Sequence, residues 1–490
     1  MFFTSPPRQQ APIDDLESTI PHPVKSAGDA DKHSERTSMK NKILVVYEKL
    51  GMGHKRMADI VNQMLTESFD AEVVLKTGSE LVGTTTVNAF VAFWNWLLRN
   101  SLFRTADILV NTFARLFPMT LGDAFDIRHF FSVMDEIRPQ LIVSTADIYN
   151  KALGAYAAER GLPLFIFIAD ISVYHDVVNK HAVHFCYFKE TIEALQRFDL
   201  SRTYFSCCLD ESTTIARKTG YLFRYWYDHI LHPYSRPMRH DITECSSAAK
   251  NKLKCIAFGP LAKRASFQPH DKEKIAAKLR IKNDADNILI ASGSIGGRLV
   301  LDIVQILSSR LVRPCNLLVM CGNDTRLYQE MKRLAKTHPH VYPYPWVYNF
   351  DEFMAVSACM VGRHSASVFV DSLVARVPCV AFGYVLKNDS GTASMIKKYG
   401  TGEVVRGTEG LVRAVTSVLD DRSRYVQNID AFLQSYPKSH AEMKSIVINE
   451  IGQVMVPELE RIMANTIKSP WDVARASIVY RKHEEEDATC

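Results

Sequence analysis

Lys42-Ile43-Leu44-Val45-Val46-Tyr47, with Gly51-Met52-Gly53-His54 close behind it, is the stretch that decides the fold. A short apolar run of this kind is typical of a parallel strand buried on both faces. Apolar residues at helical spacing follow the glycines, and a second strand is expected at Glu72–Lys76. The order strand, loop, helix, strand predicts a right-handed crossover unit of a doubly wound sheet.

The same alternation continues along the first half of the chain and then restarts. Strands are expected at Gln140–Ser144 and Leu164–Ala169, and Cys255–Pro260 is expected to close the first half. In the second half, strands are expected at Asn287–Ala291, Asn316–Cys321, His340–Tyr344, Ala358–Val361 and Pro378–Phe382. We therefore predict an α/β protein with two Rossmann-like, doubly wound domains facing a cleft, where the carboxyl ends of the strands bind ligands.

The length of 490 residues is too great for one hydrophobic core. Residues 1–38 are rich in Pro, Ser, Asp and Lys, which predicts a disordered tail. We predict an N-terminal Rossmann-like domain over residues 39–268, with an insertion at 197–250 that lacks clear periodicity. A C-terminal Rossmann-like domain is expected over residues 269–465, followed by a helix and charged end at 466–490.

Composition narrows the class of function. The chain is 47% hydrophobic and 23% charged, as in an ordinary globular protein, and its net charge of +5 does not require nucleic acid as a partner. The ten cysteines follow no disulfide or zinc spacing, which favours reduced thiols in the cytosol. No secretory signal or long apolar span is evident, so we expect a cytoplasmic protein that can be peripheral on the inner membrane face.

Residues 87–117 are unusual because aromatic and leucine side chains alternate with Arg99, Arg104 and Arg115. One interpretation is a pair of interfacial helices that dip into a bilayer. The other is a pair of core helices whose arginines lie at the solvent edge. The sequence leaves these two interpretations equally supported.

The first candidate site is the loop of Gly51 and Gly53, with His54 at the start of the following helix. Glycines allow close approach of a ligand, and the start of a helix offers free N–H groups. His54 can act as a general base there, or it can simply position the loop. Asp170, after the strand at Leu164–Ala169, can orient the base or an acceptor, or cap a helix. His175 lies five residues further on.

Three loops of the second half are candidates for binding a nucleotide sugar. Ser292–Arg298 contains five small residues before a helix and can cradle a diphosphate, or it can be a tight turn. In Gly362–Ser367, Ser365 or Ser367 can cap the next helix, whose first residues can also bind phosphate. Asp371 can reach ribose hydroxyls. The loop from Gly383 to Asp389 has polar groups that suit a sugar. No acidic pair indicates a required metal.

Taken together, these motifs resemble the monogalactosyldiacylglycerol synthase and processive diacylglycerol glucosyltransferase family. They are more distantly similar to the peptidoglycan lipid-linked N-acetylglucosaminyltransferase. The likeness covers roughly residues 41–405, apart from 197–250. The matching segments are Lys42–His54, Ile166–His175, Gly259–Phe267, Tyr344–Phe350, Gly362–Pro378 and Gly383–Gly391.

This resemblance implies a glycosyltransferase B fold and an inverting, metal-independent transfer from a UDP-sugar. His54 would be the base or an orienting residue on the acceptor side, where Gly51, Gly53 and His175 also lie. On the donor side, the implied contacts are Ser294 and Gly296 to the diphosphate, Val347 to uracil, Asp371 to ribose, and Asn388 and Asp389 to the sugar. No cofactor is implied, because the UDP-sugar is a substrate. Family members carry membrane-facing helices where residues 87–117 lie.

The sequence also departs from the family pattern. Met52 replaces one of the usual three glycines of the opening loop. The diphosphate loop of the family is usually Lys-Pro/Ala-Gly-Gly-like, whereas here it is Arg363-His364-Ser365-Ala366, with no glycine after Gly362. Arg363 and His364 would have to replace the lost amide contacts. Asp371 is one methylene shorter than the usual Glu, and Asn388-Asp389 stands where the family often has Gln-Glu. These differences leave the donor sugar open.

We therefore expect a transferase that moves a hexose or N-acetylhexosamine from a UDP-sugar to a lipid or other amphipathic acceptor. Three alternatives remain: a nucleotide-sugar epimerase or hydrolase of the same fold, a transferase acting on a non-lipid small molecule, and a non-catalytic nucleotide-sugar-binding protein.

Overall fold

The computed structural model describes residues 42–49, 52–83, 85–109, 127–147, 149–173, 177–179, 181–196, 253–282 and 285–464. The predicted tail (1–38), the insertion (197–250) and the charged end (466–490) lie outside the described residues. Contacts between residues divide the chain into two units, residues 1–39 and residues 40–490. All of the described residues belong to the second unit.

The first sheet has six parallel strands in the order β2-β1-β3-β4-β5-β6. They are β1 (Lys42–Tyr47), β2 (Glu72–Thr77), β3 (Leu141–Ser144), β4 (Leu164–Ile168), β5 (Val183–Cys186) and β6 (Lys254–Ala257). Four consecutive residues of β1, from Ile43 to Val46, are fully buried, as the apolar run predicts. The associated helices are α1 (Gly53–Ser68), α2 (Gly78–Val82), α6 (Ile127–Ile137), α7 (Asn150–Arg160) and α8 (Lys189–Leu195).

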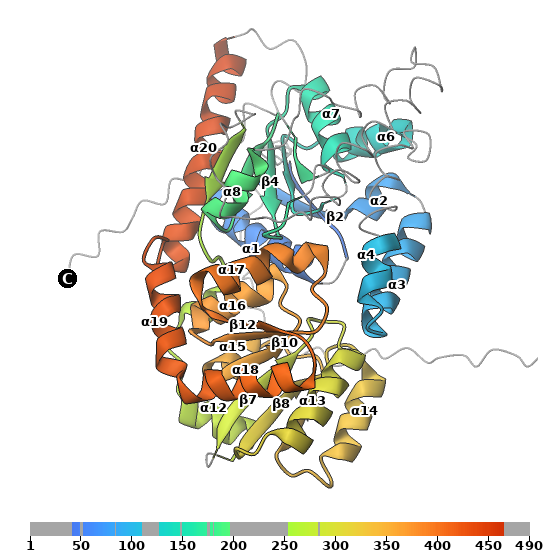
Figure 1. Cartoon of the computed structure of the whole chain (residues 1–490). Helices are drawn as coiled ribbons and strands as arrows, with labels where there is room; N and C mark the ends of the chain where they lie inside the picture. Colours follow the sequence, from blue (N-terminus) through green and yellow to red (C-terminus); the bar gives the residue numbers. More distant parts are fainter. Residues whose placement is uncertain are drawn as a thin grey trace, which may run out of the picture. The chain divides into compact units, whose positions relative to one another are not determined.

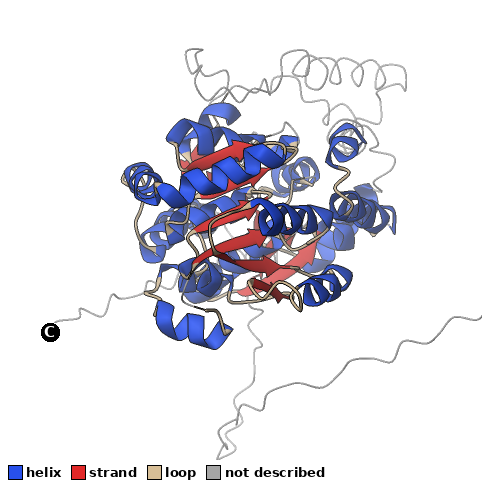
Figure 2. Ribbon diagram, turned by 60° about the horizontal axis from the view of Figure 1, so that its bottom comes forward, coloured by secondary structure: helices blue, strands red, loops and turns tan. Residues whose placement is uncertain are grey.

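The second sheet also has six parallel strands, in the order β12-β11-β10-β7-β8-β9. They are β7 (Asp286–Ala291), β8 (Cys315–Met320), β9 (Val341–Tyr344), β10 (Cys359–Gly362), β11 (Cys379–Phe382) and β12 (Gly402–Val405). Its helices include α12 (Lys272–Leu279), α13 (Arg298–Arg310), α14 (Thr325–Leu334), α15 (Phe350–Ala355), α16 (Ala366–Ala375), α17 (Ser390–Tyr399), α18 (Thr408–Asp420) and α19 (Arg422–Leu433). Helices pack around the strands, as expected of parallel sheets (Figure 2).

The prediction of two doubly wound parallel sheets is therefore confirmed. In each sheet the strand order reverses at one point, between β1 and β3 in the first and between β7 and β10 in the second. Loops at the carboxyl ends of strands on either side of such a reversal form the usual ligand site of this fold. The predicted loops at Gly53, Ser292 and Gly362 follow β1, β7 and β10, so all three lie at these reversals.

The sequence analysis did not predict β5, α8 or β12. In β5, His184 interrupts the apolar run, although its side chain is fully buried and its Nε2 accepts the Asn179 backbone N–H at 3.1 Å. β12 is an edge strand that contains Gly402 and Glu403, so its pattern is weakly apolar. Both strands are recognisable only through their pairing with neighbouring strands.

Two helical segments pack away from the sheet that their sequence position indicates. The long helix α20 (His440–Ala464) follows the second sheet, but Met443 and Val447 share a core cluster with Met64 and Leu65 of α1 (Figure 1). Conversely, α3 (Thr85–Arg99) and α4 (Phe103–Ile108) follow β2, but their inner side chains join the core of the second sheet. The two domains are thus connected by exchanged elements.

The cysteines agree with the expected reduced state. Those within the described residues are free, and most are buried. Burial raises the pKa of the Cys321 and Cys379 thiols to about 12, so they behave as apolar core groups.

Candidate active site

His54 occupies the first turn of α1, directly after β1, and is 7% exposed. Its Nδ1 lies 2.7 Å from the carbonyl oxygen of Thr145, which follows β3. A carbonyl only accepts, so Nδ1 carries the proton and donates to it. The Thr145 hydroxyl in turn donates to the His54 carbonyl at 3.0 Å. Thr145 therefore fixes the ring, and Nε2 is left for other groups.

The Nε2 side of His54 faces carboxylates. Asp147 is 5% exposed, and its Oδ2 lies 3.7 Å from Nε2. Asp170, which follows β4, completes the group. One ring nitrogen of His54 and one carboxylate oxygen each of Asp147 and Asp170 all lie within 4.8 Å of one another. A hydroxyl group entering here would meet a nitrogen that can take its proton and carboxylates that can accept hydrogen bonds.

Sequence reasoning found His54 and Asp170 but missed Thr145 and Asp147. The available signal was their position, because Thr145-Ala146-Asp147 directly follows a predicted strand at its carboxyl end. Glu48 was also missed, although it has the same signal, a position just after a predicted strand. It is 1% exposed just after β1, and it accepts the Tyr149 hydroxyl at 3.0 Å.

The helices α1 and α16, which follow the loops after β1 and β10, begin near each other. An ideal Cβ added to Gly53, the first residue of α1, would lie 3.7 Å from the Ser367 hydroxyl in the first turn of α16. The side-chain cap considered for Ser365 is absent, because Ser365 makes no capping bond and its hydroxyl lies 3.3 Å from that of Ser367. Met52 makes no side-chain cap at α1. Two helix N-termini without side-chain caps give a locally positive region suited to an anion.

In the Ser292–Arg298 loop, packing requires the glycine at position 296. Gly296 has φ of 68°, and a Cβ there would lie 2.3 Å from the Cys321 carbonyl oxygen. The Ser294 carbonyl accepts the Asn323 N–H at 3.0 Å. The loop is therefore folded tightly onto the turn after β8. The diphosphate contacts of Ser294 and Gly296 remain predictions.

In the third loop, the two residues expected to replace lost amide contacts are already engaged or buried. Arg363 forms an ion pair with Asp389, with Nε to Oδ2 at 2.6 Å. Burial raises the pKa of Asp389 to about 6, although Arg363 opposes the rise. His364 is 3% exposed, and its Nδ1 lies 3.1 Å from the Gly362 carbonyl. Its Nε2 has no hydrogen-bond partner within the described part of the chain, and in this tautomer it can only accept.

The buried imidazole of His364 leads to a prediction about stability. Burial lowers its pKa to about 4, although the bond to Gly362 acts in the opposite direction. An unfolded histidine titrates near 6.5, so only the unfolded chain takes up this proton between about pH 6.5 and 4. The His364 contribution to stability is therefore present above that window and is lost as the pH falls through it, by about 3 kcal/mol at most.

His364→Gln should thus reduce the loss of stability between pH 7.5 and pH 4.5. Urea unfolding at the two pH values measures this difference, with His338→Gln at a partly exposed histidine as the matched control. An unchanged pH dependence in the His364 variant would contradict the assignment.

Asp371, the predicted ribose ligand, lies in α16 and is 5% exposed. Both of its carboxylate oxygens accept hydrogen bonds from the guanidinium of Arg56 in α1. Each carboxylate oxygen has two lone pairs, so the pair can coexist with a ribose contact. The ribose role remains a prediction, and the ion pair is a contact between the two domains that the sequence did not indicate.

The fourth loop comes next to the His54 group. Asn388 donates to Asp170 Oδ2 at 3.4 Å, and the backbone N–H of Gly391 donates to the Ser172 hydroxyl at 2.8 Å. The predicted sugar loop and the predicted base cluster are therefore in contact. Val347 is half-buried in the loop after β9, where its uracil contact stays a prediction. Gly51 and His175 lie outside the described residues.

In the described part of residues 87–117, the core interpretation is confirmed for one face, and the interfacial interpretation stays a prediction. The inner faces of α3 and α4 lie in the core of the second sheet, through Trp94, Leu97, Leu98, Phe103 and Ala106. Their outer face exposes large apolar side chains: Phe93, Trp96, Leu102, Ile108 and Leu109. Residues 110–117 lie outside the described residues. Among the helices that can be inspected, none is both long and apolar enough to cross a bilayer.

These observations define the architecture as the glycosyltransferase B fold. A UDP-glucosyltransferase from Polygonum tinctorium, described as capable of glucosylating indoxyl, superposes with a TM-score of 0.51 at 10% identity, over 85% of this chain and 99% of that protein. At this identity, the similarity demonstrates the fold alone.

Sequence comparison with curated proteins identifies processive diacylglycerol β-glucosyltransferases. The protein of Bacillus pumilus (strain SAFR-032) is 25% identical over 182 residues, covering 36% of this chain and 46% of the relative. The Bacillus cereus (strain AH187) protein is 24% identical over 201 residues, covering 40% and 51%. The chain thus spans about half the length of the curated relatives it matches. No family model matches the chain.

Proposed function

We propose that this protein is an inverting glycosyltransferase that uses a UDP-sugar and a lipid or other amphipathic acceptor. The observation that carries the proposal is the contact between Asn388, in the loop expected to hold the donor sugar, and Asp170, beside the expected base His54. Donor and acceptor groups would meet at this contact. The sequence similarity to diacylglycerol β-glucosyltransferases supports the same chemistry.

In the proposed reaction, the acceptor hydroxyl binds beside Nε2 of His54. Its oxygen attacks the anomeric carbon while its proton passes to Nε2, and the bond from that carbon to the diphosphate oxygen breaks. UDP leaves as an anion stabilised by the N-termini of α1 and α16. Attack opposite to the leaving group inverts the anomeric configuration. The chemistry needs no cofactor, and we propose that it needs no metal.

The test is a screen of UDP-sugars by thermal shift, followed by transfer to membrane lipid extract with a radiolabelled donor. We expect one or a few UDP-sugars to stabilise the protein, and labelled glycolipid to form in the presence of a chelator. Labelled free sugar, or an epimer of the donor, without any acceptor product would identify a hydrolase or epimerase instead. Binding without consumption of any donor would identify a sensor.

We further propose that the α3–α4 segment contacts a lipid surface from the cytoplasmic side. Phe93 and Trp96 are 41% and 52% exposed and stack with a centroid distance of 6.2 Å. Arg99 and Arg104 of the same two helices are exposed, and Arg99 also lies 3.7 Å from the Asp324 carboxylate. The one acidic residue among residues 85–109 is Asp107, which is 1% exposed. An outer face with aromatic and basic groups suits anionic headgroups above acyl chains.

Replacing both aromatic residues, Phe93→Ser with Trp96→Ser, should weaken vesicle binding by about tenfold or more, because two apolar side chains no longer leave water. Flotation with vesicles containing anionic lipid measures the effect. Tyr348→Ser, at an aromatic residue that is 80% exposed elsewhere, is the control. If the double variant floats like the unsubstituted protein, the proposed membrane contact is wrong.

A further inference from the structure

The α3–α4 segment is placed where it can affect the second domain. Trp94, Leu97 and Phe103 pack in one cluster with Leu299 and Val300 of α13. The end of α3 also meets the start of α13, since a Cβ on Gly297 would lie 2.5 Å from the Arg99 carbonyl oxygen. A segment that lies between β2 and β3 in the chain is therefore built into the core beside the second sheet.

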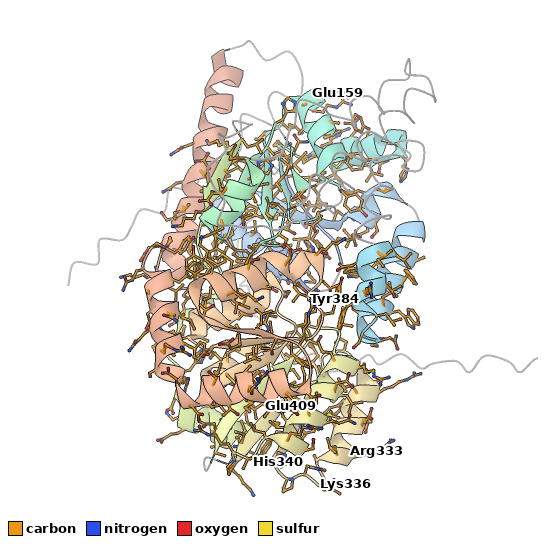
Figure 3. All side chains as sticks on the ribbon, in the orientation of Figure 1. Glu159, Arg333, Lys336, His340, Tyr384 and Glu409 are labelled. Atoms are coloured by element: carbon orange, nitrogen blue, oxygen red, sulfur yellow. The ribbon has the colours of Figure 1, made fainter. Side chains whose placement is uncertain are left out.

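From this position, α4 directs one buried carboxylate at the loop after β11. Asp107 Oδ1 accepts the backbone N–H of Lys387 at 3.1 Å. Burial raises the pKa of the Tyr384 phenol in the same loop to about 12, and the Asp107 charge adds to the rise. Figure 3 shows Tyr384 beside α3 and α4. Asp107 thus binds this loop at the backbone of Lys387, with Tyr384 close by.

The rest of the loop is held by other elements. Lys387 begins the 3-10 turn η5 (Lys387–Asp389), in which Asp389 pairs with Arg363. Asn388 donates to Asp170, and Gly391 donates to Ser172. The start of the loop is therefore fixed by Asp107, while its end is fixed by residues that follow β4 and β10. Fixing the start determines where the Asn388 side chain lies.

A buried carboxylate is costly unless donors satisfy it. Burial lowers the pKa of the Lys387 ammonium to about 8, and the Asp107 charge opposes that fall. Asp107 therefore has the backbone N–H of Lys387 as a donor, and the Lys387 ammonium and Tyr384 phenol of the same loop interact with its charge. A residue with only a packing role in α4 would be apolar, like its buried neighbour Ala106.

We propose that Asp107 is a positioning residue for the donor-sugar loop, holding the backbone of Lys387 so that Asn388 is presented beside Asp170. The inference rests on the proposed function for the role of this loop in holding a donor sugar, but the positioning itself can be tested without turnover. Asp107 does not contact the reacting atoms in this arrangement. Its replacement should therefore weaken binding of the donor sugar rather than binding of the nucleotide.

The test compares Asp107→Ala, Asp107→Asn and Thr105→Ala, an exposed position on the same helix. In Asp107→Ala, we expect amides of Lys387–Gly391 to exchange with deuterium at least about tenfold faster, as a hydrogen bond to a charged group is lost. We expect the KM for the UDP-sugar to rise about tenfold while UDP affinity changes less than twofold. Asp107→Asn keeps an acceptor oxygen and should lie within about threefold of the unsubstituted protein.

The outcomes separate the inference from the proposed function. Faster exchange in Asp107→Ala, with Thr105→Ala unchanged, supports the positioning role even if no UDP-sugar is turned over, in which case the transferase proposal alone fails. Unchanged exchange and an unchanged donor KM in Asp107→Ala overturn the inference. An equal rise in the dissociation constant of UDP itself also overturns it, because the effect would then be general. If Asp107→Ala does not fold, the test rests on Asp107→Asn. A tenfold or greater rise of its KM for the UDP-sugar would contradict the role of Asp107 as a hydrogen-bond acceptor.

Discussion

His54→Ala is expected to reduce turnover by about 10²–10⁴-fold while the protein still binds UDP. The imidazole is held by Thr145 so that Nε2 faces Asp147 and Asp170, and the lone pair of Nε2 is in place to accept a hydroxyl proton. We predict that UDP binds through the loops after β7, β9 and β10, and the alanine keeps the backbone N–H groups at the start of α1, so UDP binding should survive. Single-turnover transfer and calorimetry with UDP measure the two quantities.

Asp147→Asn provides the comparison for this prediction. The amide keeps the size of the side chain but removes the charge that faces Nε2 at 3.7 Å. We expect it to reduce turnover less than His54→Ala, because the base itself is retained. Turnover of the His54 variant close to that of the unsubstituted protein would refute the base role and leave His54 as a residue that only positions its loop.

Arg56→Met should lower the free energy of unfolding by about 3 kcal/mol, because it leaves the buried Asp371 carboxylate without its cation. Arg56 is partly exposed, with 21% of its side chain accessible, which places the effect toward the lower end for a buried pair. Combining Arg56→Met with Asp371→Leu should recover much of this loss, since no buried charge is then left unpaired. Urea unfolding of the two single variants and the double variant measures the coupling.

The same pair tests the ribose prediction. Asp371→Asn removes the charge from the predicted ribose contact and should weaken UDP binding by about tenfold, the usual effect of losing a charge-assisted hydrogen bond. Arg56→Met retains the carboxylate and should weaken UDP binding less. If Asp371→Asn binds UDP normally, the carboxylate serves only the contact between the domains, and the ribose ligand must be another residue.

Much of the fold could be predicted because its signals are local. The buried run from Ile43 to Val46 and the alternation of strands and helices are enough to indicate parallel sheets. The loops at Gly53, Ser292 and Gly362 could be selected because ligands of parallel sheets bind at the carboxyl ends of strands. The strands β5 and β12 were not predicted, because each has only four residues and is interrupted by a polar residue or a glycine.

The side-chain pairings could not be predicted in this way. Arg56 and Asp371 are 315 residues apart in the chain, and Asp107 and Lys387 are 280 apart. Sequence patterns report which face of a helix or strand is buried, but not which distant element covers it. The arginine and acids were therefore visible as residue types, while their partners depended on how the two domains pack.

The sequence by itself determined the two doubly wound sheets and the loops that bear the candidate chemistry, because apolar periodicity and glycine placement act over a few residues. Tertiary structure alone decided that α3 and α4 join the second core, that Thr145 and Asp147 frame His54, and that Arg363 is paired with Asp389. These features depend on burial and on hydrogen-bond partners, which exist only once distant segments have come together.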